Sequence, residues 1–293
     1  MPPPVTRSVT VAEAGPVRLI VLAGQRETAS DALSERFGAS HRCLIPLAGR
    51  PLIAHVLQTA AQHPKIGSLA VCIEHEAFDP VWDVLTQLPG RGAVTLVEAR
   101  TDVAESVRAA AEGWSGPLLI TTADHALLSA ASIDAVVEKL ERADITLTLA
   151  PRSAVEAVYP AGNTHYLPLR EGQFAPCDLY GVSDNRFLEA ASIFRGRNAS
   201  GRISLRMLRA TGLVGLLLLW LGLATLPGAI DRASRRLKAR VRAVVTDDGS
   251  QAIDVGDEQS YAIVRHLLEQ NTDRCAAEDS PSIRAVNGQR TTV

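Results

Sequence analysis

Polar residues follow apolar segments of this chain at the points where those segments end. The apolar run 17–23 leads into Gly24 and Arg26, and the run 117–121 leads into Asp124. A glycine turn lets backbone N–H groups approach a phosphate, and an arginine adds positive charge there. A carboxylate at such a position is a candidate metal ligand. An aspartate after a strand is also commonly a helix cap, so each feature has a structural alternative.

A further polar feature lies late in the chain, where Asp254 stands in the segment 252–257. Asp257 stands in the same segment and is a second carboxylate candidate there. The loop residues His41 and His125 are adjacent to candidate residues, and we expect both to be solvated.

The elements that position these residues follow from hydrophobic periodicity. Strands that alternate with helices at this spacing predict an α/β fold with a doubly wound, mostly parallel, Rossmann-like sheet. In such a sheet the ligand site lies at the carboxyl ends of the strands, where the polar features would meet. The predicted strands cover residues 17–23, 68–73, 94–97, 117–121, 144–150 and 241–245.

Helices and tails complete the predicted domain organisation. Pro51 marks the start of one helix, and Ser132 is the predicted N-cap of another that runs to about Arg142. Residues 151–180 are less regular and predict a small antiparallel excursion. The remaining predictions are helices over 101–112 and 259–270, a helical insertion over about 186–240 near the C-terminus, a flexible tail over 1–15, a single domain over 16–270 and a disordered tail over 271–293.

Composition restricts the classes of function. The 293 residues carry 30 basic and 32 acidic side chains, so no global positive field attracts nucleic acid. Aromatic residues make up only 4%, which argues against a stacking platform for single strands. No apolar signal follows the N-terminus, and the cysteines are widely spaced, so we expect a cytoplasmic protein. The cysteines are Cys43, Cys72, Cys177 and Cys275.

An uncharged, leucine-rich segment lies between Arg209 and Asp231. Its length permits a membrane span, but a proline and several glycines interrupt it, and basic residues flank it. A buried helical hairpin and an interfacial helix on anionic lipid are the alternatives. A single crossing would place Asp124 and Asp254 on opposite sides of the membrane, where they could not share a metal. We therefore expect, at most, a peripheral membrane contact through residues 209–242.

Three segments together resemble the MobA-like nucleotidyltransferases, within the wider glycosyltransferase-A-like superfamily. VRLIVLAGQR and HRCLIPLAGRPLIAHVL are similar to the family's opening, which is a strand, LAGG-x-x-x-R, a loop and K-x-L-x-x-L-x-G-x-P-L-I. TTADHALL resembles its second motif, an aspartate after an apolar strand. AIDVGDEQSYAIVRHLLE resembles its closing motif, D-I-D-T-P-E-D-L followed by a helix. The motifs occur in family order and cover most of residues 17–270.

The resemblance implies a glycosyltransferase-A type of sheet and a nucleotidyltransferase. Such an enzyme transfers a nucleoside monophosphate from an NTP to a phosphorylated small-molecule acceptor and releases pyrophosphate. Arg26, Arg42 and Asp124 would be catalytic, and Asp124 and Asp254 would hold Mg²⁺. The residues that the resemblance places at the nucleotide are Leu22, Ala23, Gly24, Arg26, Arg42 and Ser106. Those in the irregular middle region, where the acceptor would bind, are Thr164, Tyr166 and Asp178.

The chain departs from the family pattern at several of these positions. Gln25 replaces the second glycine, Arg42 replaces the lysine, and Gly256 and Asp257 alter the closing motif. Arginine and lysine are not interchangeable at a phosphate. A catalytically degenerate nucleotide-binding or regulatory relative is therefore one alternative. A nucleotide-sugar glycosyltransferase on the same fold is another, although TADHAL lacks the D-x-D typical of that class.

Overall fold

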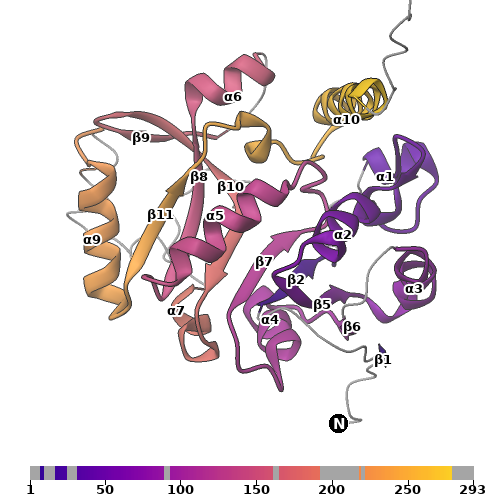
Figure 1. The fold of residues 1–293 in the computed structure, drawn as a ribbon, viewed down its shortest axis with the longest axis horizontal. Helices are drawn as coiled ribbons and strands as arrows, with labels where there is room; N and C mark the ends of the chain where they lie inside the picture. The colour runs from indigo at the N-terminus through magenta and orange to yellow at the C-terminus, as the bar shows by residue number, and fades with distance from the viewer. Residues whose placement is uncertain are drawn as a thin grey trace, which may run out of the picture.

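The computed structural model describes residues 7–9, 17–24, 32–88, 93–160, 165–191, 218 and 222–278. Within this part of the chain, nine strands form one sheet in the order β1-β6-β5-β2-β7-β10-β8-β11, and β9 pairs with β10 (Figure 1). The strands are β1 (Arg7–Val9), β2 (Val17–Leu22), β5 (Ile66–Ile73), β6 (Ala93–Glu98), β7 (Leu118–Thr122), β8 (Ile145–Pro151), β9 (Leu167–Leu169), β10 (Gly172–Val182) and β11 (Val241–Val245). The pairs within β6-β5-β2-β7 and the pair β8-β11 are parallel, whereas β10 runs antiparallel to both β7 and β8. The predicted doubly wound, mostly parallel α/β fold is confirmed.

The central strands bury side chains on both faces, as a parallel sheet covered by helices requires. In β2, Leu19 and Val21 enter one hydrophobic cluster and Ile20 enters the cluster on the opposite face. The first face is covered by α2 (Leu52–Gln62), α3 (Phe78–Thr86) and α5 (Ala130–Leu140). The opposite face is covered by α4 (Val103–Ala111), α7 (Leu188–Ala191) and α9 (Leu226–Leu237).

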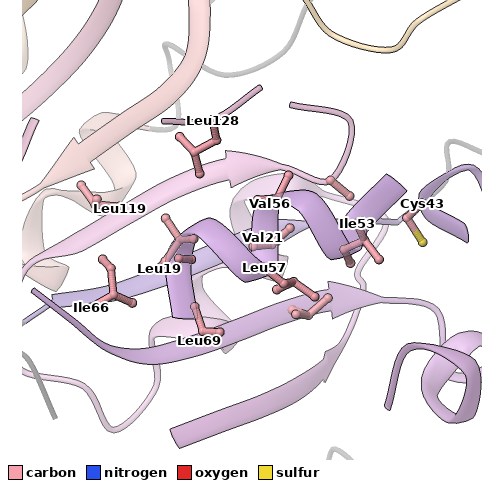
Figure 2. Packing of buried hydrophobic residues seen from close by; sticks show 14 of the residues in the cluster. Leu19, Val21, Cys43, Ile53, Val56, Leu57, Ile66, Leu69, Leu119 and Leu128 are labelled. Atoms are coloured by element: carbon pink, nitrogen blue, oxygen red, sulfur yellow. The ribbon is translucent and has the colours of Figure 1, made fainter. Parts of the chain in front are cut away.

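Helix α2 shows how this packing fixes the strand ends. Its residues Ile53, Val56 and Leu57 are fully buried and lie over Leu19 and Val21 of β2 (Figure 2). Full burial of each such side chain contributes about 1.5–3 kcal/mol. The end of β2 is therefore held rigidly at the edge of the sheet.

Several short elements and one long helix lie at the carboxyl edge of the sheet. A third hydrophobic cluster joins the 42–52 segment to the C-terminal segment through Ile45, Leu47, Ile253 and Val255. Tyr261 adds a hydrogen bond from its hydroxyl to the carbonyl oxygen of Pro46, at 2.7 Å. The elements concerned are α1 (Ala32–Phe37), η1 (Arg42–Leu44), β3 (Pro46–Leu47), β4 (Arg50–Pro51), η2 (His75–Ala77), α6 (Arg152–Val158), η5 (Gly249–Ala252) and α10 (Glu258–Glu278).

Some boundaries differ from the sequence-based predictions. Ser129, and not Ser132, caps α5, because the Ser129 side chain accepts a hydrogen bond from the Ser132 N–H. The predicted flexible N-terminal tail contains a strand, β1, which pairs with β6 at the edge of the sheet. Helix α10 continues to Glu278, past its predicted end. Elements α3 and α6 were not predicted at all.

The predicted helical insertion is described only at its ends. Helix α7 and the short η3 (Asn185–Phe187) lie at its start, and α9 lies near its end. Residues 192–217 and 219–221, which contain most of the leucine-rich segment, lie outside the described residues. In the described part of the chain, no helix combines the length and the apolar character needed to cross a membrane.

Candidate metal and nucleotide site

Three carboxylates converge at the carboxyl edge of the sheet. Asp124, Asp178 and Asp254 each offer an oxygen atom, and these atoms all lie within 4.8 Å of one another. Asp124 follows β7, Asp178 lies in β10, and Asp254 follows η5. The structure thus brings together the two residues predicted as metal ligands. It adds Asp178, which the resemblance assigned to the acceptor.

A break in strand pairing accounts for the position of Asp178. Leu179 pairs with Thr121 of β7, but on the β8 side the register shifts between Cys177 and Tyr180. A β-bulge of this kind re-aims a side chain and is frequent next to functional sites. Because β10 is antiparallel, it brings Asp178 back to the end of β7, beside Asp124.

The surroundings of Asp124 fit a bound cation. Its Oδ1 atom is buried and has no hydrogen-bond partner among the described residues. A buried carboxylate oxygen without a partner is costly unless a positive charge compensates it. All three converging groups are carboxylates, which are the ligands that Mg²⁺ prefers. The backbone also ties two of them together, because the N–H of Val255 donates to the carbonyl oxygen of Asp124 at 3.1 Å.

The end of β2 lies between this carboxylate cluster and the end of β5. The N–H of Ala23 donates to Cys72 on one side, and the N–H of Ala123 donates to Leu22 on the other. Gly24 is exposed, yet a Cβ atom there would lie 3.0 Å from Ala99 Cβ. The glycine therefore permits a close approach of the loop to Ala99 and Glu74, and its role as a phosphate loop stays a prediction. Arg26, the predicted phosphate ligand, lies outside the described residues.

Arg42 begins η1 and is half-buried. The next residue, Cys43, is buried, and its pKa is raised to about 12, mainly by burial and then by the negative charges of Glu74 and Asp124. His41, which directly precedes Arg42, lies 3.7 Å from Glu74 at the end of β5, so η1 lies close to the carboxyl edge of the sheet. The structure therefore places Arg42 near the site, and its contact with phosphate stays a prediction.

Glu74 is a candidate functional residue that the sequence analysis did not select. It directly follows β5, and its Oε1 atom would lie 3.1 Å from a Cβ atom at Gly24. His41 Nε2 lies 3.7 Å from Glu74 Oε2. The prediction of a freely solvated His41 is therefore wrong, because its side chain contacts a carboxylate. The signal that finds Glu74 is the one used for Asp124, a polar residue directly after a buried strand.

Two other predicted site residues have structural partners. Ser106 is buried, and its Oγ atom accepts a hydrogen bond from the N–H of Arg100 at 2.8 Å, which anchors the loop after β6. Tyr166 packs against the cluster that contains Cys177, and the Arg152 guanidinium lies 5.3 Å from the centroid of its ring. Neither belongs to the carboxylate cluster, and their nucleotide and acceptor roles stay predictions. Thr164 lies outside the described residues.

His125 and Asp257 differ from their predicted environments. His125 is fully buried, and its Nδ1 lies 3.1 Å from the hydroxyl of Thr121, so the expectation of a solvated side chain is wrong. Burial lowers the pKa of His125, although the neighbouring charges of Asp178 and Asp124 act in the opposite direction. Asp257 accepts a hydrogen bond from the Ser260 N–H at 2.8 Å and thereby caps α10. It is not part of the carboxylate cluster.

The fold and this edge define an α/β protein of the nucleotide-binding type, with a candidate cation site next to a glycine turn. The chain belongs to the MobA-like NTP transferase domain family, whose pattern it matches over residues 19–192. It is thus a member of a nucleotidyltransferase family. No curated protein matches the sequence significantly.

Solved structures support this assignment at the level of the fold. A hypothetical transferase from Thermus thermophilus is 28% identical with a TM-score of 0.66, over 84% of this chain and 99% of that chain. The 4-diphosphocytidyl-2C-methyl-D-erythritol synthase of Anaerococcus prevotii is 12% identical with a TM-score of 0.56, over 88% and 100%. A CMP:2-keto-3-deoxy-manno-octonic acid synthetase complexed with CTP is 13% identical with a TM-score of 0.53, over 88% and 100%. At these last two identities the likeness concerns the fold alone.

Proposed function

We propose that the protein transfers a nucleoside monophosphate from an NTP to a phosphorylated small-molecule acceptor and releases pyrophosphate. The observation that supports this most is the convergence of Asp124, Asp178 and Asp254 beside Gly24 in a member of a nucleotidyltransferase family. In this proposal Asp178 is one of the metal ligands and lies next to the site where the acceptor binds. The three carboxylates would hold Mg²⁺, which when bound neutralises negative charge on the phosphate oxygens.

The chemistry asks the protein mainly for positioning. An oxygen of the acceptor phosphate attacks the α-phosphorus in line, a new P–O bond forms, and the bond to the β-phosphate breaks with pyrophosphate as the leaving group. The attacking phosphate is already ionised near neutral pH, so no general base is required. The backbone after Leu22 and Ala23 would orient the triphosphate, and Arg26 and Arg42 would balance the charge of its outer phosphates. Ser106 would border the base, and Thr164 and Tyr166 the acceptor.

The test is pyrophosphate release with each NTP and a panel of sugar, polyol and alcohol phosphates, in Mg²⁺ and in EDTA. We expect one NTP and one class of phosphorylated acceptor to give Mg²⁺-dependent release. Nucleotide binding without release for any acceptor would instead support the non-catalytic alternative. Release that requires a nucleotide-sugar as donor would support the glycosyltransferase.

The same proposal includes a peripheral contact with the cytoplasmic face of a membrane, through residues 209–242. Arg235, Arg236, Lys238 and Arg242 are exposed and form no ion pair with other described residues, and the side chain of Leu223 is 57% exposed nearby in sequence. Basic residues at an anionic surface contribute about 1 kcal/mol each, and the attraction falls with salt.

Vesicle co-sedimentation tests this contact. We expect binding to vesicles that contain phosphatidylglycerol and not to pure phosphatidylcholine, release by high salt, and loss in the double variant Arg235→Glu, Arg236→Glu. The matched control is Arg108→Glu with Arg265→Glu, which removes the same charge from other helices. Equal binding by the two double variants, or extraction by detergent only, would contradict the proposal.

A further inference from the structure

A buried glutamine joins the two loops that carry Asp124 and Asp254. Gln251 lies in η5, and only 1% of its surface is exposed. Its Nε2 donates a hydrogen bond to the carbonyl oxygen of Leu127 at 2.7 Å, and its Oε1 accepts one from the N–H of Ser129 at 3.3 Å. Nε2 also donates to Asp248 Oδ2 at 3.0 Å. The side-chain amide of Gln251 thus donates one hydrogen bond to this loop and accepts one from it, as a backbone peptide group does between paired β-strands.

These hydrogen bonds fix which residue of one loop faces which residue of the other. Going along the chain, Leu127 comes after Asp124, whereas Gln251 comes before Asp254. The second connection joins the Val255 N–H to the Asp124 carbonyl oxygen. The two loops therefore run in opposite directions. The hydrogen bond between Val255 and Asp124 lies beside the carboxylates, and the hydrogen bond between Gln251 and Leu127 lies about one turn away from them.

Apolar packing alone would leave this register undetermined. Ile253 and Val255 pack with Leu127 in one hydrophobic cluster, but the hydrophobic effect is not directional. On its other side, η5 lies directly on α6, since a Cβ atom at Gly249 would be 2.1 Å from the carbonyl oxygen of Ala154. The hydrogen bonds of Gln251 therefore connect η5, which packs against α6, to the loop that follows Asp124.

We infer that Gln251 is a positioning residue that sets the distance and orientation of Asp254 relative to Asp124, and thereby tunes the site for Mg²⁺. This inference rests on the proposed function of the carboxylate cluster as a metal site. Mg²⁺ demands near-ideal octahedral geometry with short bonds, whereas Ca²⁺ accepts longer bonds and variable geometry. Loss of the register should therefore weaken Mg²⁺ binding more than Ca²⁺ binding.

The test measures metal binding to the nucleotide-free, full-length chain at a temperature well below unfolding. Free Mn²⁺ is followed by electron paramagnetic resonance, and Mg²⁺ and Ca²⁺ are measured by competition. Gln251→Met keeps the volume of the side chain and removes the amide. Loss of a group that hydrogen-bonds a metal ligand directly typically lowers metal affinity by about 10–100-fold, and Gln251 acts one step further away, through the loop, so we expect Mn²⁺ and Mg²⁺ affinity to fall about tenfold. Ca²⁺ affinity should fall less.

Asn185→Leu is the matched control. Asn185 Nδ2 also bridges two carbonyl oxygens, those of Ala111 at 3.2 Å and Trp114 at 2.5 Å, next to the strand end Val182 that pairs with the start of β7. We expect this variant to lose thermal stability and keep its metal affinities. If Gln251→Met does not fold, Gln251→Asn, which keeps an amide too short to reach, is measured in its place.

The outcomes separate this inference from the proposed function. If the wild-type chain binds none of the three ions, the proposed metal site itself fails. If the wild type binds them and the Gln251 variant keeps the same affinities and the same Mg²⁺ to Ca²⁺ preference, only the positioning role fails. A proportional loss for all three ions, or an equal loss in Asn185→Leu, would reduce Gln251 to a purely structural residue and overturn the inference.

Discussion

Replacement of Asp178 by asparagine tests whether the three carboxylates act as a single cation site. The change keeps the size of the side chain and removes one of three negative charges whose oxygens lie within 4.8 Å of one another. Two unit charges at that separation repel by about 1 kcal/mol in water and about 3 kcal/mol at an effective dielectric constant of about 20. Asp178 is half-buried, so its environment lies between these limits. Asp178 faces two such charges, those of Asp124 and Asp254, so we expect the free energy of unfolding of the metal-free variant to rise by about 2 kcal/mol or more.

In Mg²⁺ the stability advantage of Asp178→Asn should shrink or reverse, because Mg²⁺ stabilises the wild type more than the variant. A ligand present at 100 times its Kd adds about 2.7 kcal/mol to the stability of the folded state. The wild type should gain this amount at a Mg²⁺ concentration 100 times its own Kd, and Asp178→Asn should gain much less at the same concentration. Urea unfolding at pH 8, in EDTA and in Mg²⁺, measures both quantities.

Asp247→Asn is the control for this experiment, because Asp247 is an exposed aspartate outside the cluster. It should change neither the metal-free stability nor the gain from Mg²⁺ appreciably. The reasoning would be refuted if Asp178→Asn were less stable than the wild type in EDTA, or if it gained as much from Mg²⁺. Either result would mean that the carboxylates do not repel one another or do not share an ion.

Three further predictions concern neighbouring residues. Asp124→Ala should abolish pyrophosphate release and leave the chain folded, with a free energy of unfolding in EDTA that rises because one charge of the same cluster is removed, and normal turnover in Mg²⁺ would remove Asp124 from the mechanism. Arg42→Ala should raise the KM for the NTP and lower kcat, because the triphosphate charge is present in both the ground and the transition state. Arg42→Lys should recover much of the loss if only charge is needed, and NTP binding by Arg42→Ala as tight as in the wild type would contradict this role. Burial lowers the pKa of His125 below its usual 6.5, so the unfolded chain takes up the proton first and stability should fall as the pH drops below about 6.5. Chemical unfolding of His125→Gln between pH 5 and 8 checks this, and an unchanged pH dependence in the variant would exclude His125 as its source.

Local sequence patterns were sufficient for the class of fold and for part of the site. The apolar runs that became β5 and β7, and β2 apart from Arg18, are recognisable because strands buried on both faces must be continuously apolar. Once the sheet is known to be mostly parallel, all of its parallel strands end at one edge. That rule alone places Gly24 and Asp124 at the same edge, and it would have found Glu74.

Only the tertiary structure decided the remaining features of the site. Asp178 joins the cluster because β10 inserts antiparallel between β7 and β8 and carries a bulge, and neither fact is written in the residues around it. The hydrogen bonds of Gln251 and Val255 link segments more than a hundred residues apart. Strand order and bulges depend on the competition among non-local pairings and on the packing of whole helices, which no local periodicity encodes. The sequence by itself thus determined the alternation of strands and helices and one edge of the sheet, whereas the convergence of three carboxylates on one point required the folded chain.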